Sequence, residues 1–362
     1  MSVWSRLYNG ETEFRFVPRW RLWFAISGLI ILAGMASLLT RGLNLGIDFE
    51  GGVAWETPAG SASVADARDA VADAGVLDAR VQELGTGGDR SIRVQAEESD
   101  DPGAVTDALA ELTGADPSDI SYQEVGPSWG EEITNKAIRA LIVFLVLITV
   151  YIAMRFEWKM AVATTLALVH DILVTVGIYS LFGFPVTPAT VIAFLTILGF
   201  SIYDGIVVFD RVDENARALL ATNDRTYSRM VDDSMNQVLM RTLNTSITSL
   251  IPIGSLLVVG SLVLGATTLQ EFALALFIGM LSGAYSSIFI ASPALALLKE
   301  REDHWSKLRS RLGPQADEVA PRRSTAEVEE PTGDAPAPAV AGPRPTTVGS
   351  IQARGRKKGR RR

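Results

Sequence analysis

Six long apolar stretches constrain the fold of this chain more than any other feature of its sequence. A helix needs roughly 20 mostly apolar residues to cross the hydrocarbon core of a bilayer. Six stretches meet that requirement, at residues 22–39, 137–155, 160–181, 188–209, 243–264 and 272–298. The sequence therefore predicts an integral membrane protein whose membrane part is an all-α bundle of six transmembrane helices.

The first stretch has an alternative interpretation as a cleaved signal peptide. It follows Arg19 and Arg21, and the segment before it is long and contains Glu11 and Glu13. No small-x-small site followed by a clear mature start is present. We therefore expect a retained membrane helix, preceded by an N-terminal segment at residues 1–21.

Lys and Arg residues near the helix ends predict the orientation of the chain in the membrane. They are frequent in residues 1–21, in the connectors after the second and fourth stretches and in the C-terminal tail, whereas the links FGFPVTP and GATTLQE contain none. Lys136 and Arg139, at the outer end of the second helix, weakly oppose this pattern. We expect both termini in the cytoplasm and residues 44–132 outside it.

The segment at residues 44–132 has a charge and a periodicity of its own. It carries twenty acidic side chains and four arginines. The predicted elements are a strand at 52–57, a helix at 61–74, strands at 79–84 and 91–96, a helix at 102–112 and a strand at 120–125. This β-α-β-β-α-β order is typical of a ferredoxin-like sandwich, so we expect an inserted extracytoplasmic α+β domain.

The tail at residues 299–362 is basic, with fifteen basic against nine acidic side chains, and it ends in GRKKGRRR. From about Arg311 it is rich in Pro, Ala and Thr and lacks aromatic residues, so we predict that it is largely disordered. Its basic end could touch anionic lipid or ribosomal RNA. The alternative is a solvated tail, and no specific nucleic acid is expected as a partner.

The residue types and motifs that are missing exclude several kinds of chemistry. The chain has no cysteine and only two histidines, His170 and His304, so we expect no thiolate or multi-histidine metal site. Neither a G-x-x-x-x-G-K-S/T loop nor a dinucleotide-binding fingerprint is present. We expect no cofactor, and any work must draw on an ion gradient or on the ATPase of a partner.

Two aspartates inside the apolar stretches are candidate functional residues, because buried charges in a membrane are costly and usually face a partner or a water path. Asp171 lies near the middle of the third stretch, next to His170, and Asp204 lies in the cytoplasmic half of the fourth. Neither has a basic neighbour one turn away within its stretch. Each must find a partner on another helix, bind a proton or be reached by water.

Asp204 is the stronger candidate for proton coupling, and it shares a helix face with Ser201 and Arg211. A carboxyl that alternates between an apolar environment and contact with an arginine picks up and releases a proton. Arg241, at the start of the fifth stretch, is the proposed counter-charge. The hydroxyl-bearing residues after it could line a water path or bond to the backbone; they are Thr245, Ser246, Thr248 and Ser249.

Each of these candidates also has a structural alternative. Asp204 could form a static ion pair between helices, and Asp171 could do the same. Arg241 could be an anchor at the membrane surface. We expect His170 to be a packed or hydrogen-bonded side chain rather than a proton relay.

Six motifs occur in the same order as in a known family. They are LGIDFEGG, EVGPSWGEEI, ALVHDILVTVGIYSLFG, GFSIYDGIVVFDRVDEN, NQVLMRTLNTSIT and FALALFIGMLSGAYSSIFIASPAL. Together they resemble the SecD/SecF family, a branch of the resistance-nodulation-division (RND) superfamily, over about residues 20–298. The resemblance implies an RND-type half of six helices with an extracytoplasmic ferredoxin-like domain.

The resemblance also implies partners and site residues. Members pair with SecD, which carries a matching six-helix half, associate with the SecY channel complex, and use the proton-motive force to promote export of polypeptides across the bacterial cytoplasmic membrane. The membrane aspartate of the family matches Asp204, and the arginine of its R-T-L motif matches Arg241. Tyr203 and Gly205 depart from the Asn and Thr that often flank that aspartate.

The sequence thus favours a non-enzymatic, proton-coupled accessory subunit of a protein translocase, in contact with membrane lipids and with the exported polypeptide. One alternative is a half-transporter of the same superfamily that exports small molecules or lipids. The other is a passive scaffold of the translocon. Neutralising Asp204 separates the proton-coupled subunit from the scaffold.

Overall fold

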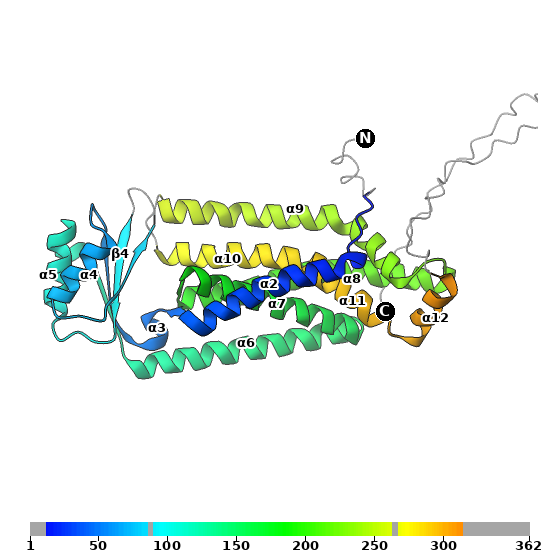
Figure 1. Cartoon of the computed structure of the whole chain (residues 1–362), viewed down its shortest axis with the longest axis horizontal. Helices are drawn as coiled ribbons and strands as arrows, with labels where there is room; N and C mark the ends of the chain where they lie inside the picture. The colour runs from blue at the N-terminus through cyan, green and yellow to red at the C-terminus, as the bar shows by residue number, and fades with distance from the viewer. Residues whose placement is uncertain (1–11, 86–89, 263–266, 314–362) are drawn as a thin grey trace, which may run out of the picture. The chain divides into compact units, whose positions relative to one another are not determined.

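Six helices of the structure are long and apolar enough to cross a membrane. The structure is a computed structural model, and it describes residues 12–85, 90–262 and 267–313. The helices are α2 (Trp20–Arg41), α6 (Pro127–Arg155), α7 (Trp158–Phe182), α8 (Pro188–Thr222), α9 (Tyr227–Leu262) and a continuous segment made of α10 (Thr267–Ser286), a π-helical turn (Ser287–Ala291) and α11 (Ser292–Lys299). They pack side by side in one bundle (Figure 1), which confirms the predicted six-helix membrane domain.

Small residues allow these helices to approach closely where they cross. A Cβ atom on Gly34 of α2 would lie 2.5 Å from the Cα atom of Gly177 on α7. A Cβ atom on Gly279 of α10 would lie 2.2 Å from the Cδ1 atom of Ile197 on α8. No side chain fits between the backbones of Gly34 and Gly177, so the crossing of α2 with α7 depends on glycine, whereas a side chain at Gly279 would have to displace that of Ile197.

We expect Gly177→Leu to push α2 away from α7 and to lower the melting temperature of the purified protein in detergent. Overpacking of this kind costs about 1–3 kcal/mol. Gly199→Leu is the matched control, because a side chain at Gly199 of α8 meets open space. Equal melting temperatures for the two variants would contradict the proposed role of the contact between Gly34 and Gly177.

An antiparallel sheet with two helices lies between α2 and α6 in the chain, and we call residues 52–125 the sheet domain. Its strands are β2 (Gly52–Pro58), β3 (Arg80–Leu84), β4 (Ser91–Ala96) and β5 (Ser121–Val125), in the spatial order β3-β4-β2-β5. Helices α4 (Val64–Asp73) and α5 (Pro102–Thr113) cover one face of the sheet (Figure 1). The strands and helices follow the order that the sequence predicts.

Alternating apolar residues build the core of the sheet domain. Trp55 of β2 is fully buried and stands opposite Val94 on β4 and Tyr122 on β5. Val71 of α4 and Leu109 of α5 are also fully buried in the same cluster. The sheet domain therefore has a hydrophobic core separate from those of the bundle.

A short linker joins α2 to the sheet domain, and the sequence did not predict its elements. It contains β1 (Asn44–Leu45), which pairs in parallel with β6 (Pro185–Val186), and the one-turn helix α3 (Ile47–Glu50). Gly51 and Gly52 follow with φ angles of 81° and 113°, which favour glycine. Helix α3 packs against α6, where a Cβ atom on Gly130 would lie 2.7 Å from the carbonyl oxygen of Phe49.

The ends of α8 and α9 farthest from the sheet domain extend well beyond the predicted apolar stretches. Helix α8 runs to Thr222 instead of residue 209, and α9 begins at Tyr227 instead of residue 243. Helix α12 (Asp303–Leu312) packs on this extension, with the rings of Trp305 and Tyr227 5.0 Å apart. It lies in the predicted basic tail at 299–362, almost entirely before the part from about Arg311 that is predicted to be disordered, and it buries Trp305 and Leu308 on one face. Residues 314–362 of that segment lie outside the described residues.

The residues before α2 are held by polar side chains of α9. The carboxylate of Asp232, which is 2% exposed, accepts hydrogen bonds from the backbone N–H groups of Phe16 and Val17 at 2.9 and 2.8 Å. The amide of Asn236 makes two hydrogen bonds with the backbone of Phe14, at 2.9 and 2.8 Å. We call this contact the N-terminal clamp.

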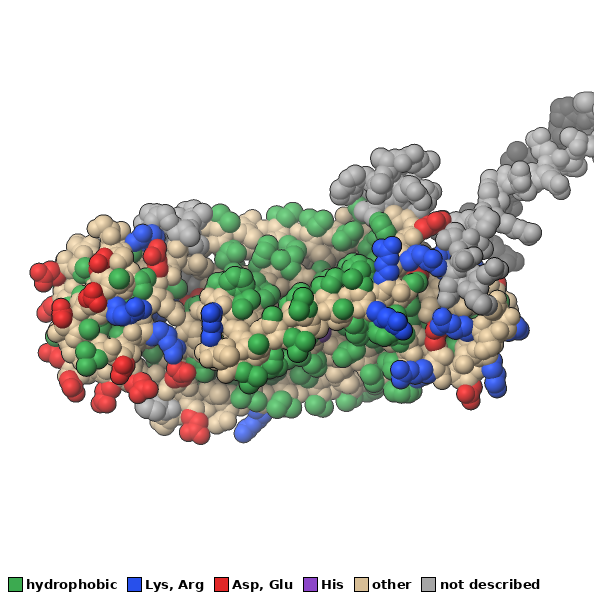
Figure 2. Space-filling model, viewed as in Figure 1, with side chains coloured by type: hydrophobic (Ala, Val, Ile, Leu, Met, Phe, Trp, Pro, Cys, Tyr) green, Lys and Arg blue, Asp and Glu red, His purple; other side chains and the backbone are tan. Residues whose placement is uncertain are grey.

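Charged side chains gather at the two ends of the bundle and apolar ones between them. Figure 2 shows acidic side chains over the sheet domain, apolar side chains over the helices, and Lys and Arg side chains around the ends of the helices farthest from the sheet. Large apolar side chains are exposed along the helices; among them are Leu29, Leu39, Leu147, Met154 and Ile251. An exposed apolar band of this kind is expected of helices in contact with lipid.

Candidate functional site

The carboxylate of Asp171 lies in the middle of the bundle and is 1% exposed. It accepts hydrogen bonds from the hydroxyl groups of Ser201 on α8 at 2.7 Å, Ser282 on α10 at 2.9 Å and Ser286 on α10 at 2.8 Å. The Nδ1 atom of His170 lies 3.1 Å from the same carboxylate. Three helices thus contribute polar groups to one buried acid.

Hydroxyl groups of two neighbouring helices satisfy the side chain of the buried Asp171. Three hydroxyl donors compensate a buried negative charge, and hydrogen bonds to charged groups contribute about 1.5–3 kcal/mol each. A hydroxyl can also accept a hydrogen bond, so a protonated Asp171 would still have partners. Among the described residues, no Lys or Arg side chain forms an ion pair with Asp171.

His170 is packed against aromatic and polar groups of neighbouring helices. It is 6% exposed, and its ring stacks on that of Tyr285, with 5.9 Å between the centroids. The hydroxyl of Tyr285 donates to the carbonyl of Trp23 and accepts from Ser27, both at 3.2 Å. The buried Nε2 atom of His170 has no hydrogen-bond partner within the described part of the chain.

Asp204 lies in a different setting, on the border of a cavity of about 20 Å³ between α8, α9 and α10. A cavity of this size holds about one water molecule when polar groups surround it. The polar or small residues that line it are Ser201, Thr245, Ser246, Ser249 and Gly283. Asp204 is half-buried, and it makes no hydrogen bond or ion pair with any of the residues that the structure describes.

Ser201 connects the surroundings of the two aspartates. Its hydroxyl donates to Asp171, and its side chain also lines the cavity beside Asp204. Gly283 makes this closeness of α8 and α10 feasible, since a Cβ atom there would lie 3.2 Å from the Cβ atom of Ser201 and 3.6 Å from Oδ2 of Asp171. Ser201 therefore contacts Asp171 directly and also borders the cavity of Asp204.

The structure does not bring the predicted counter-charge to Asp204. Arg241 is exposed on α9 and forms no ion pair with Asp204 in this structure. Arg211, on the predicted face of α8, instead bonds to Gln237 and Glu214, both at 2.5 Å.

Sequence reasoning missed the serines of α10. Ser282 and Ser286 are four residues apart and so lie on one face of the helix. In the sequence they belong to the stretch GMLSGAYSS, which is made mostly of small residues and contains no charged one. The sequence signal that could have revealed them as hydrogen-bond donors is Asp171, a charged residue in another apolar stretch that needs polar partners.

Comparisons with known proteins match most of the chain. The family model "Protein export membrane protein SecD/SecF, C-terminal" matches residues 104–301, and the model "SecD/SecF GG Motif" matches residues 36–53. The chain belongs to the SecD/SecF family. The GG motif of this family covers the end of α2 and the linker, including Gly51 and Gly52, whose positive φ angles explain the two glycines.

Members of the family named as SecF are similar over much or all of the chain. Protein translocase subunit SecF of Streptomyces coelicolor is 41% identical over 371 residues, which cover 100% of this chain and 99% of that protein. The SecF subunit of Mycobacterium tuberculosis is 43% identical over 312 residues, which cover 83% of this chain and 71% of that protein. The family resemblance seen in the six sequence motifs is thus confirmed.

Two solved structures of SecDF have a similar fold. The crystal structure of SecDF, a translocon-associated membrane protein from Thermus thermophilus, superposes with a TM-score of 0.70 at 33% identity, over 81% of this chain and 39% of that one. A super-membrane-facing form of SecDF gives a TM-score of 0.59 at 34% identity, over 82% and 40% of the two chains. This chain therefore spans about two fifths of the SecDF chains that it matches.

Proposed function

We propose that this chain is an accessory subunit of the Sec protein translocase, which uses the proton-motive force to promote export of polypeptides across the bacterial cytoplasmic membrane. The observation that carries the proposal is the match to a translocase subunit SecF over the whole length of both chains. The proposed role is that of a transport component without enzymatic activity or cofactor.

The main partner that we propose is SecD. The chain covers 39% of a solved SecDF chain, so a second half of comparable size would complete the assembly. The SecY channel complex, the exported polypeptide and membrane lipids are the other proposed partners. The exposed apolar side chains along the helices support contact with lipid or with a second six-helix half.

We also propose the domain organisation and the orientation. Residues 1–21 and 299–362 are cytoplasmic, 22–39 and 137–298 form the membrane part, and 44–132 form an extracytoplasmic ferredoxin-like domain. The spatial order of the strands supports this class, because numbering β2 to β5 as 1 to 4 gives the order 2-3-1-4. The basic side chains at one end of the bundle support the orientation (Figure 2).

Proton coupling is proposed to centre on Asp204, with Asp171 and Arg241 as further members of the pathway. The cavity beside Asp204 has room for about one water molecule that can exchange a proton with its carboxyl group, and none of the described residues that line it is a Lys or Arg. Ser201 can pass a proton between the cavity and Asp171, because a hydroxyl both donates and accepts. Arg241 is exposed and apart from Asp204 in this structure, so the proposal requires a second state of the cycle in which a charged Asp204 attracts Arg241 and protonation releases it.

The proposed function is tested in cells that depend on this gene for growth. The secreted mature protein is followed during depletion of the chain, with and without a proton uncoupler. We expect depletion to slow export and to remove most of its sensitivity to the uncoupler. Normal export after depletion would refute the translocase role, and accumulation of a lipid or small molecule would then favour the half-transporter. Slower export that keeps its uncoupler sensitivity would favour a passive scaffold.

A further inference from the structure

An ion pair joins the sheet domain to the membrane helices. The Nη1 atom of Arg93 on β4 lies 2.5 Å from the Oε1 atom of Glu271 on α10. The same guanidinium pairs with Glu56 of β2 at 3.0 Å, and the second oxygen of Glu271 accepts a hydrogen bond from the hydroxyl of Thr187 at 2.9 Å. Among the described residues of the sheet domain, Arg93 is the only one whose side chain forms a hydrogen bond or ion pair with a helix of the bundle.

The pair is buried, with side-chain exposures of 12% for Arg93 and 8% for Glu271. Burial lowers the pKa of Arg93, but the carboxylates of Glu271 and Glu56 more than offset this effect and raise it. Arg93 therefore stays charged. A buried ion pair fixes geometry while adding little net stability, because desolvation cancels much of the attraction. Such a contact can hold two parts in place without binding them permanently.

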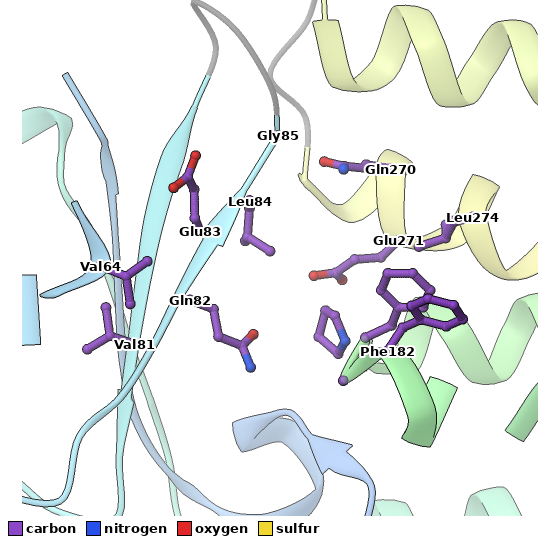
Figure 3. Close-up of a pocket in the computed structure, with 13 residues that line it drawn as sticks. Val64, Val81, Gln82, Glu83, Leu84, Gly85, Phe182, Gln270, Glu271 and Leu274 are labelled. Carbon is purple, nitrogen blue, oxygen red and sulfur yellow. The ribbon is translucent and has the colours of Figure 1, made fainter. Parts of the chain in front are cut away.

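A cleft lies beside the ion pair, and along it the sheet domain and the membrane helices do not pack directly against each other. It has a volume of about 440 Å³ and separates β3 from the ends of α7 and α10 nearest the sheet. Figure 3 shows Gln82 and Leu84 of β3 on one side, Phe182 of α7 on the other, and Glu271 directed from α10 toward the sheet. The sheet domain therefore has room to move relative to the helices on this side.

The linker also attaches the sheet domain, and at the other end of the domain Gly126 joins β5 directly to α6. Helix α3 of the linker packs against α6, and its glycines Gly51 and Gly52 adopt positive φ angles next to β2. The linker is part of the backbone, so it still joins the sheet domain to α2 when the ion pair between Arg93 and Glu271 breaks. The sheet domain is thus attached covalently by the linker and by Gly126, and Arg93 makes its polar contact with a helix of the bundle.

Helix α10 connects the polar contact to the two membrane acids. Glu271 lies near its start, Ser282 and Ser286 bind Asp171, and Gly283 lines the cavity of Asp204. A helix is a rigid element, so a shift of α10 at the aspartates also displaces Glu271. A change in protonation inside the membrane can reach the sheet domain by this path.

We propose that Arg93 and Glu271 form a releasable latch, which holds the sheet domain on the bundle and opens during the working cycle. When the latch is open, the domain turns about its two covalent connections, the linker and Gly126, and the cleft beside β3 widens. The expected effect of the latch on export rests on the proposed function in protein export. The expected movement of the sheet domain does not depend on that function.

The first test locks the latch, using the fact that the chain has no cysteine of its own. Arg93→Cys and Glu271→Cys are combined and joined in cells by a short, reducible bis-methanethiosulfonate linker. We expect export to fall when the linker is added and to recover after reduction. The control joins Glu132→Cys to Lys136→Cys within α6, where both side chains are exposed. Equal export by the locked variant and the control would overturn the proposal.

The second test measures movement without relying on export. Spin labels are placed at Asp107→Cys on α5 and Asn135→Cys on α6, which are both exposed. The distance between them is measured in the SecD-containing complex in lipid vesicles. We expect two populations for the parent chain and a shift to the open one for Glu271→Gln. Glu83→Gln, which lines the same cleft but pairs with Arg90, should leave the populations unchanged.

A single distance that is the same in the parent chain and in Glu271→Gln would overturn the latch even if export depends on the chain. Two populations together with normal export after depletion would instead support the latch and refute the proposed function. The two ideas can therefore fail separately.

Discussion

Asp204→Asn is expected to abolish the part of export that depends on the proton-motive force. The substitution keeps the size and polarity of the side chain beside its cavity but removes its ability to bind and release a proton. Loss of a positioned proton-transfer group should slow the driven step on the order of tenfold or more. The measurement compares export by the variant and by the parent chain at matched membrane levels, with and without an uncoupler.

Asp210→Asn is the control for this prediction. Asp210 lies on the same helix, is exposed, and is 3.6 Å from Arg155, so we expect export and uncoupler sensitivity to be unchanged. If Asp204→Asn exports like the parent chain and keeps its uncoupler sensitivity, the proton site lies elsewhere, and the chain becomes mainly a structural subunit.

Asp171→Ala is expected to destabilise the protein more than the overpacking substitution Gly177→Leu does. Removing the carboxylate leaves three buried serine hydroxyls without their acceptor and opens a cavity among α7, α8 and α10. Loss of hydrogen bonds to a charged group costs about 1.5–3 kcal/mol each, so a total of several kcal/mol is expected. Thermal unfolding of the purified protein in detergent measures this loss.

Asp171→Asn separates a structural role from proton coupling. The amide oxygen still accepts from the serines, so we expect the variant to lose less stability than Asp171→Ala. Export driven by the proton-motive force should nevertheless fall if Asp171 exchanges protons with the Asp204 cavity through Ser201. A stable Asp171→Asn variant with full export would assign Asp171 to packing alone.

Hydropathy and alternation in the sequence predict most of the fold. The six membrane helices follow from apolar length, because only a helix satisfies its own backbone over such a distance in lipid. The strands of the sheet domain follow from alternation, as in Ser91–Ala96, where the predicted and observed bounds agree. Polar helix extensions were missed because α8 after residue 209 and α9 before residue 243 carry many charged residues and are not apolar.

The candidate site was predictable only in part. A charged residue in an apolar stretch is visible in the sequence, so Asp171 and Asp204 were both found. Their partners were not, because they depend on which faces of distant helices meet. Ser282 and Ser286 are more than a hundred residues from Asp171 in sequence, and the linker helix α3 depends on close contact with Gly130. Arg241 matched a family motif, yet its side chain is exposed and apart from Asp204 here.

The N-terminal clamp has a consequence for biogenesis. Phe14, Phe16 and Val17 are synthesised more than two hundred residues before their partners Asp232 and Asn236. During translation these backbone amides must therefore remain hydrated until the fifth membrane helix has been made. A nascent chain that stops before α9 cannot bury them, and its unpaired N-terminal segment would distinguish an incomplete subunit from a finished one for membrane proteases.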